Sequence, residues 1–379
     1  MGFIERREKL YDWMAEEGIN LLLLEDAEDH RDKAVRYLTG QPGDALLFLS
    51  LARKSLLVPW DVNMANVYAD VDDILPYTKF ELNPYVAAKA AAAYFKTPYG
   101  SRIEVPAQTS YPSFLKYVEN LSDYDIICRD EGAKSEIERL RSIKDSDEIH
   151  IYRICSEKTN EIIDLIEKNV VDKTLKTETD VALFIEAECR KRGCEGTGFS
   201  TLAAGPSRSF GIHCFPPYTA APFAEKGLSI LDFGIVWQGY SSDVTMTFAR
   251  ALTKAQERQI LLIEKAFDLA YNTVAGPFKS KKEDASIPSR DIALVIDDFF
   301  KKEKCFMPHG LGHGIGLDVH EAPYLRRGAD NKGKIERNMI FTIEPGLYDP
   351  AAGGCRFEND ILITDDGAEI LTRSKIVRL

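Results

Sequence analysis

Four acidic residues in the C-terminal half of the sequence lie among apolar residues in strand-like segments. Asp232 ends the strand-like LSILDFG, and Asp243 lies within GYSSDVTMTF. Glu344 follows the strand-like FTI, and Glu358 lies within CRFENDILIT. Burying a carboxylate costs free energy unless it is paired or bound to a metal ion. Gly239 allows a hairpin that brings the first two acids together. The chain must therefore fold so that these acids meet a partner of opposite charge.

A glycine-rich segment, residues 307–323, carries three of the six histidines. Its sequence is MPHGLGHGIGLDVHEAP, with His309, His313 and His320. The alternating glycines make a helix implausible and let the backbone come close to other groups. Four carboxylates and the glycine-flanked His313 form an oxygen-rich ligand set that suits two divalent ions such as Mn²⁺, Co²⁺ or Zn²⁺. The segment lacks the second histidine of HExxH and the glycine spacing of a dinucleotide-binding loop.

The composition narrows the class of protein. At roughly 150 residues per domain, the chain is long enough for two to three domains. The sequence holds 48 Lys and Arg against 60 Asp and Glu, a net charge of −12, which argues against nucleic acid or an anionic membrane as a partner. Seven cysteines without a CxxC pair argue against a disulfide framework or a thiolate zinc site. The charged N-terminus lacks the apolar core of a signal peptide, and no apolar run is long enough to span a bilayer. We expect a cytoplasmic protein.

The pattern along the chain predicts two domains. Residues 1–133 form a small mixed α/β domain, in which apolar runs of strand length alternate with helices. Residues 134–379 form an α+β domain with an antiparallel sheet flanked by helices. The charged segment 134–168, free of Gly and Pro, connects them as one long helix or as two helices broken near Asp145. The segment 279–284 is expected to be a solvated loop. The predicted helices are 5–18, 87–95, 178–192, 254–273 and 288–302, and the predicted strands of the first domain are 19–24, 45–50 and 54–60.

The motifs together resemble a known family. LDFG followed by SSDVTMTF, HGLGHGIGLDVHEAP, FTIEPGLY and GGCRFENDILIT are similar to the successive motifs of the pita-bread metallopeptidases. The nearest group is that of the Xaa-Pro dipeptidases (prolidases) and aminopeptidase P. RYLTG at 36–40 and LRSIKDSDEI at 140–149 resemble that group's N-terminal domain and junction. The resemblance implies an α+β protein, with a creatinase-like α/β domain over 1–133 and a pita-bread catalytic domain over 134–379.

The resemblance implies a role for each motif residue in metal binding. Asp232 and Asp243 match ligands of one metal ion, with Asp243 also bridging. His313 and Glu344 match ligands of the other ion, and Glu358 matches the second bridging carboxylate.

The resemblance also implies roles beside the metals. His320 matches a histidine that moves protons or steadies the intermediate, and His309 matches a histidine that lines the substrate pocket. Arg356 matches a polar residue that supports the site. His213, in AGPSRSFGIHCFPP, matches the upstream catalytic histidine. The nearby aromatic residues Phe215, Tyr218 and Phe223 either line a pocket or pack in a core.

The function implied by these matches is hydrolysis of a peptide bond preceding proline, in Xaa-Pro dipeptides or at the N-terminal Xaa-Pro of peptides. A hydroxide bridging two divalent ions, first of all Mn²⁺, attacks the carbonyl, and Glu344 relays the proton to the leaving nitrogen. The expected partners are a small peptide substrate and a second copy of the chain in a homodimer. One alternative is a metal-dependent hydrolase or lyase of a small non-peptide zwitterion. A non-catalytic binding protein is the other alternative.

Overall fold

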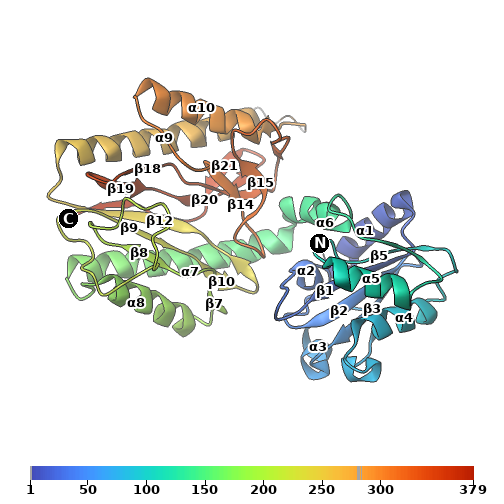
Figure 1. The fold of residues 1–379 in the computed structure, drawn as a ribbon. Helices are drawn as coiled ribbons and strands as arrows, with labels where there is room; N and C mark the ends of the chain where they lie inside the picture. Colours follow the sequence, from blue (N-terminus) through green and yellow to red (C-terminus); the bar gives the residue numbers. More distant parts are fainter. Residues whose placement is uncertain (1, 280–281, 283) are drawn as a thin grey trace. The chain divides into compact units, whose positions relative to one another are not determined.

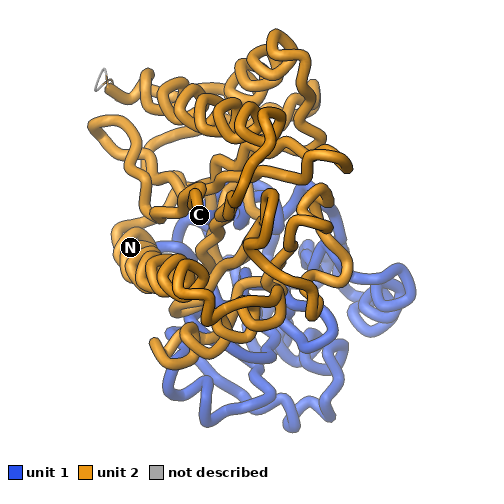
Figure 2. The backbone as a smooth tube through the Cα atoms, turned by 90° about the vertical axis from the view of Figure 1, so that its left-hand side faces the viewer, with its two compact units in different colours: residues 1–141 blue, residues 142–379 orange. Residues whose placement is uncertain are grey.

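The computed structural model describes residues 2–279, 282 and 284–379. The chain divides into two compact units, Met1–Arg141 and Ser142–Leu379, which Figure 2 colours separately. Within the described residues, no helix combines the length and the apolar character needed to cross a membrane. The loop predicted for 279–284 lies in part outside the described residues.

The N-terminal unit is a mixed sheet with helices around it. Its helices are α1 (Phe3–Glu17), α2 (Ala34–Thr39), α3 (Val62–Tyr68), α4 (Pro84–Tyr94), α5 (Tyr111–Asn120) and the 3₁₀ turn Tyr77–Phe80, and its strands are β1 (Leu21–Asp26), β2 (Ala45–Ser50), β3 (Lys54–Pro59), β4 (Asp73–Ile74), β5 (Arg102–Glu104) and β6 (Asp125–Ile127).

One six-stranded sheet, in the order β4-β3-β2-β1-β5-β6, organises this unit (Figure 1). β1, β2 and β3 are antiparallel neighbours, whereas β4, β5 and β6 each run parallel to the strand on their inner side. Leucines and Phe48 of the central strands pack with alanines of α4 in one apolar core. The predicted α/β architecture is therefore confirmed.

The charged connecting segment forms two helices, α6 (Ala133–Ser142) and α7 (Ser146–Val171). Between them, the side chain of Asp145 accepts hydrogen bonds from the N–H groups of Asp147 and Glu148. The side chain of Glu148 in turn accepts one from the N–H of Asp145. This capping box pairs backbone donors that the start of a helix leaves without partners. Of the two alternatives predicted for this segment, the broken helix is the one formed.

The C-terminal unit contains the sheets and helices of an α+β fold. Its helices after α7 are α8 (Glu178–Lys191), α9 (Lys254–Phe278) and α10 (Ser289–Lys302), and its strands are β7 (Gly196–Thr197), β8 (Leu202–Ala204), β9 (Gly227–Phe233), β10 (Ile235–Trp237), β11 (Tyr240–Ser241), β12 (Val244–Arg250), β13 (Ile287–Pro288), β14 (Gly312–Gly314), β15 (Glu321–Leu325), β16 (Lys334–Ile335), β17 (Ile340–Ile343), β18 (Gly346–Asp349), β19 (Gly353–Arg356), β20 (Asn359–Thr364), β21 (Gly367–Ile370) and β22 (Ile376–Arg378).

Two larger sheets form the centre of this unit. A four-stranded sheet has the order β22-β12-β9-β8, and a five-stranded sheet has the order β15-β14-β17-β20-β21. Neighbouring strands are antiparallel, except that β22 runs parallel to β12. Helices α9 and α10 lie on one side of the sheets, and α7 and α8 lie on the other (Figure 1). Each pair of helices closes its own apolar core, so the sheets are held between two cores.

The hairpin predicted from Gly239 is present. Gly239 has a φ of 86°, a backbone conformation that suits glycine, and it turns β10 into β11. Beyond this turn, β9 and β12 pair antiparallel with Asp232 opposite Thr245. Asp243, just before β12, is thereby carried to the same region as Asp232.

The sequence predicted that Asp243 and Glu358 lie inside strands, and this is wrong for both acids. Asp243 falls between β11 and β12, and Glu358 falls between β19 and β20. The N–H of Asp243 donates to Oδ2 of Asp360 at 3.3 Å, and the N–H of Glu358 donates to the carbonyl of Thr245 at 3.2 Å. The backbone at each acid is thus paired outside a regular ladder, and the strands are interrupted there.

The glycines around His313 generate a prediction about stability. A Cβ on Gly312 would lie 2.0 Å from the carbonyl oxygen of Thr342, whereas a Cβ on Gly310 would lie 3.4 Å from its nearest atom. We expect Gly312→Ala to force β14 away from β17 and to lower the free energy of unfolding by about 1–3 kcal/mol. Gly310→Ala, the matched control, should be close to wild type. Thermal unfolding of both variants is the measurement, and equal melting temperatures would contradict the prediction.

Candidate functional site

All nine residues singled out from the sequence line one cavity of the C-terminal unit. The cavity has a volume of about 570 Å³. The sequence-predicted residues in its wall are His213, Asp232, Asp243, His309, His313, His320, Glu344, Arg356 and Glu358.

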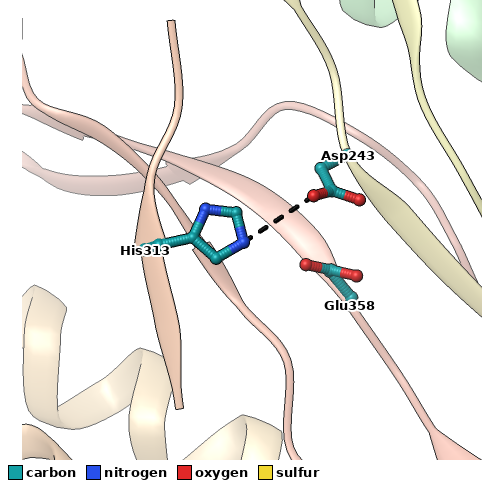
Figure 3. A group of neighbouring side chains, drawn as sticks. All are labelled: Asp243, His313 and Glu358. Atoms are coloured by element: carbon teal, nitrogen blue, oxygen red, sulfur yellow. Dashed lines mark ion pairs between the residues drawn. The ribbon is translucent and has the colours of Figure 1, made fainter. Parts of the chain in front are cut away.

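Three of these residues form a compact group of metal-ligating type. Asp243, His313 and Glu358 are all buried, and each offers one ligand atom within 4.8 Å of the others. In Figure 3, the imidazole of His313 faces both carboxylates, and its Nε2 lies 3.7 Å from Oδ2 of Asp243. One nitrogen and two carboxylate oxygens are a ligand set that divalent transition metals accept.

The other two predicted ligands lie at the edge of this group. Oε1 of Glu344 is 3.8 Å from Nε2 of His313, so that Glu344 adjoins the three-residue group. Oδ2 of Asp232 accepts a hydrogen bond from Nη2 of Arg356 at 2.6 Å. Asp232 and Glu344 therefore share the cavity with the group of three, although they are not members of that group.

The carboxylates repel one another in a dry environment. Burial, followed by the charges of Glu358 and Asp232, raises the pKa of Asp243 well above its usual value. Burial also raises the pKa of Glu344 well above its usual value and the pKa of Glu358 to about 7. Desolvation and like charges both disfavour the ionised form. The side chains of the protein alone thus do little to balance the negative charge of these carboxylates.

The site's orphaned oxygens fit a divalent ion. In the described part of the chain, Oδ1 of Asp232 and Oδ1 of Asp243 are buried atoms without a hydrogen-bond partner. Buried polar atoms in proteins are almost always paired, so each such atom needs an explanation. A cation held by these oxygens would pair them and would also cancel the repulsion among the acids. The residues present therefore fit the metal that the sequence motifs imply.

His313 is held in the tautomer that a metal ligand needs. Its Nδ1 lies 3.1 Å from the carbonyl oxygen of Gly314, and a carbonyl can only accept, so Nδ1 carries the proton. Burial, with His320 nearby, lowers the pKa of His313 to about 4, so the ring is neutral near pH 7. Nε2 consequently presents a lone pair toward the acids. The N–H of His313 donates to Oγ1 of Thr342 at 3.2 Å and anchors the strand.

A polar chain links His309 to Asp232. Nδ1 of His309 donates to the carbonyl of Gly310 at 2.7 Å, and Nε2 lies 3.0 Å from the hydroxyl of Tyr348. Burial, followed by Arg356, lowers the pKa of His309 to about 4, so its Nε2 accepts the hydroxyl proton of Tyr348. That hydroxyl accepts in turn from Nη1 of Arg356 at 2.8 Å. The chain fixes the direction of each donor, and it leaves His309 neutral beside Glu344.

His320 and His213 approach the site from its exposed side. The ring of His320 is 4.1 Å from the ring of His313, centroid to centroid. Partial burial, with His213 nearby, lowers the pKa of His320. His213 lies in the segment between β8 and β9 and is exposed to solvent. The roles that the resemblance implies for both histidines stay predictions.

The sequence analysis missed some residues that hold the site residues in place. Tyr348 lies inside the quoted FTIEPGLY, four positions after Glu344, and no charge or spacing marked it. The hydroxyl of Thr245 donates to Oε2 of Glu358 at 2.7 Å and accepts from Nε of Arg356 at 3.0 Å. Such hydroxyl contacts depend on strand register, which a single sequence does not reveal. Of the three aromatic residues predicted for a pocket or a core, Phe215 lines the cavity, whereas Phe223 belongs to an apolar core and Tyr218 packs against it.

Known proteins share both parts of this chain. The sequence model of metallopeptidase family M24 matches residues 137–365, and that of the creatinase/prolidase N-terminal domain matches residues 6–143. An uncharacterised peptidase of Methanocaldococcus jannaschii is 30% identical over 265 residues, which are 69% of this chain and 70% of that protein. A putative dipeptidase of Bacillus subtilis is 30% identical over 247 residues, which are 64% of this chain and 63% of that protein.

Solved structures share the fold over its whole length. An X-Pro aminopeptidase from Thermotoga maritima matches with a TM-score of 0.80 and 24% identity, over 98% of this chain and 99% of that one. An Xaa-Pro dipeptidase from Bacillus anthracis matches with a TM-score of 0.83 and 23% identity, over 100% of both chains. The predicted fold class, a creatinase-like N-terminal domain followed by a pita-bread domain, is thereby confirmed.

The raised carboxyl pKa values predict how a metal changes stability with pH. Without metal, these carboxyl groups bind more protons in the folded protein than in the unfolded protein. Their contribution to the free energy of unfolding is therefore lost as the pH rises through about 7, the pKa of Glu358. The lowered pKa values of His309 and His313 reduce the stability of the protein only below about pH 6.5, where the unfolded protein binds protons at these residues. A divalent ion removes the penalty on the ionised acids. We expect Mn²⁺ to raise the melting temperature more at about pH 8 than at about pH 6.5, relative to chelated protein. Equal increments at both pH values would contradict this.

Loss of the Glu358 carboxylate should weaken the binding of a divalent ion by this group of residues. Glu358→Gln keeps the size of the side chain but removes its charge. We expect the affinity for Mn²⁺ to fall by more than about 100-fold, the upper end of losses seen for residues that only support a ligand. Glu257→Gln, on the exposed face of α9, is the matched control and should bind as wild type does. Metal titration followed by elemental analysis is the measurement, and an unchanged affinity in Glu358→Gln would exclude the residue as a ligand.

Proposed function

Because the chain belongs to metallopeptidase family M24, we propose that its cavity hydrolyses peptide bonds preceding proline. The substrates are Xaa-Pro dipeptides or peptides with an N-terminal Xaa-Pro, and two divalent metal ions assist. The names of similar proteins support the proposal, since they include a putative dipeptidase, an X-Pro aminopeptidase and an Xaa-Pro dipeptidase.

The observation that carries the proposal is the meeting of four acids and one neutral imidazole in a single cavity. The metals would be held by Asp232, Asp243, His313, Glu344 and Glu358, the same set that the motifs imply. When bound, divalent ions act as Lewis acids and make water a stronger nucleophile at neutral pH.

The chain's own residues supply the proton movements and the orientation. Glu344 adjoins His313 at 3.8 Å, and burial with neighbouring charge raises its pKa, which favours its taking up a proton and delivering it to a leaving nitrogen. His320, with a lowered pKa, is a neutral donor at the exposed side of the site. Arg356, almost fully buried, holds Asp232 and Tyr348 in place through its hydrogen bonds.

The shape of the cavity suits a short peptide. Its volume of about 570 Å³ lies within the range of small-molecule sites. Apolar side chains line much of it, among them Phe199, Leu202, Phe215 and Val319. An apolar wall beside a polar centre can pack a proline ring while the carboxylates and histidines face the peptide bond. The homodimer, the Mn²⁺ preference and the cytoplasmic location expected from the sequence stay predictions.

A substrate panel tests the proposed function. The protein is loaded with Mn²⁺ or Co²⁺ and incubated with Xaa-Pro dipeptides, with Xaa-Pro-Xaa tripeptides and with small zwitterions such as creatine. We expect release of the N-terminal residue from one or both peptide classes. Glu344→Gln should lower kcat by about 10²- to 10⁴-fold, the usual contribution of a general acid or base. Glu257→Gln should keep wild-type rates. Turnover of the zwitterions alone would favour the non-peptide alternative, and inactivity toward both peptide classes with metal bound would refute the peptidase.

A further inference from the structure

A single segment, residues 205–226 between β8 and β9, carries His213 to the cavity. Ile212, Cys214, Phe215 and Pro217 line the cavity beside His213. Phe215 is 95% exposed, so packing of its own side chain does little to hold it. A long connection of this kind needs fixed points if its tip is to keep one position.

Glu178, the first residue of α8, is one such fixed point. Its side chain is completely buried. Oε1 accepts the N–H of Gly205 at 2.7 Å, and Oε2 accepts both the N–H and the hydroxyl of Thr219, each at 2.7 Å. One carboxylate thus ties the beginning of the segment to a residue near its end. The two limbs pass so closely that a Cβ on Gly205 would lie 2.1 Å from the carbonyl oxygen of Pro222.

Arg208 extends this hold toward the tip. Its Nη1 pairs with Oε2 of Glu178, and its Nη2 donates to the carbonyl of Pro216, next to Phe215. The carbonyl of Arg208 accepts from Sγ of Cys214 at 2.9 Å. A planar guanidinium can contact two acceptors at once, which an ammonium group does less well. The arginine therefore bridges the buried carboxylate and the residues flanking His213.

The segment also touches the metal-site side of the cavity. Nη1 of Arg356 donates to the carbonyl of Ile212 at 3.1 Å. The N–H of Gly354 donates to Oγ of Ser209 at 3.1 Å. The tip thus lies between two anchors, one at Arg356 and the other at the pair formed by Glu178 and Arg208.

We propose that Glu178 and Arg208 are positioning residues for the hydrolysis, since their ion pair fixes His213 and Phe215 at the mouth of the cavity. The proposal rests on the function proposed above. Neither residue lines the cavity, so neither touches substrate. Breaking this partly buried ion pair leaves the buried carboxylate of Glu178 without its counter-charge, which favours local opening of the segment that the pair holds.

Hydrogen–deuterium exchange and kinetics test the proposal on the full-length, metal-loaded protein. The variants are Arg208→Met, which removes the guanidinium, Arg208→Lys, which keeps the charge, and Glu178→Gln. Glu186→Gln is the matched control, because Glu186 also lies on α8 and pairs with an arginine, Arg190, but on the exposed face. Exchange is followed by mass spectrometry over residues 205–219, and kcat and KM are measured with an Xaa-Pro dipeptide.

We expect faster exchange confined to 205–219 in Arg208→Met and Glu178→Gln, with the metal content unchanged. The value of kcat/KM should fall by roughly 10- to 100-fold, the loss expected for a displacement of about 1 Å. Arg208→Lys should recover part of the lost kcat/KM. The double variant that combines Arg208→Met and Glu178→Gln should have a kcat/KM no lower than that of the poorer single variant, because both substitutions act through one contact. Glu186→Gln should match wild type in both measurements.

Each contrary result has a definite meaning. Unchanged exchange in Arg208→Met and Arg208→Lys would overturn the anchoring role. Faster exchange with unchanged kcat/KM would overturn the positioning role. If Glu178→Gln fails to fold, the two Arg208 variants still test the anchoring and positioning roles. An inactive wild type would refute the proposed function. The exchange measurement would then still test whether Glu178 and Arg208 hold the segment in place.

Discussion

Mutual repulsion among buried carboxylates is the constraint on which the C-terminal unit depends. Asp243, Glu344 and Glu358 share one cavity, and burial together with neighbouring charge disfavours their ionised forms. The guanidinium of Arg356 lines the same cavity, and it is engaged with Asp232 and Tyr348. A divalent ion is the counter-charge that such a set of oxygens requires.

The fold is arranged so that this costly group can exist. The sheets that carry the acids are enclosed by one apolar core under α9 and α10 and another under α7 and α8. Burial in these two cores offsets the cost of desolvating the acids. Polar contacts around the site, such as those of Thr245 and Thr342, hold each ligand in one orientation. The strands and the turns between them thereby bring the acids into one cavity.

Much of this arrangement was predictable because charge in an apolar strand is informative. Asp232, Asp243, Glu344 and Glu358 stood out against their neighbours, and alternating glycines marked the His313 segment. The sequence predicted either one long helix or two helices broken near Asp145, because a capping box at Asp145 competes with continuation of a charged helix. Tyr348 and Arg208 gave no signal, because their importance comes from partners 8 or more residues away that only folding brings near.

By itself, the sequence determined the kind of chemistry, the two-domain α+β plan and the family, because motif residues and hydrophobic periodicity are local properties of the chain. The tertiary structure alone decided how the strands are interrupted at Asp243 and Glu358, which tautomer His313 adopts, and how Glu178 and Arg208 hold the His213 segment. These features follow from pairings between distant backbone and side-chain groups. Strand register and burial set such pairings, and neither can be read from a residue and its neighbours in sequence.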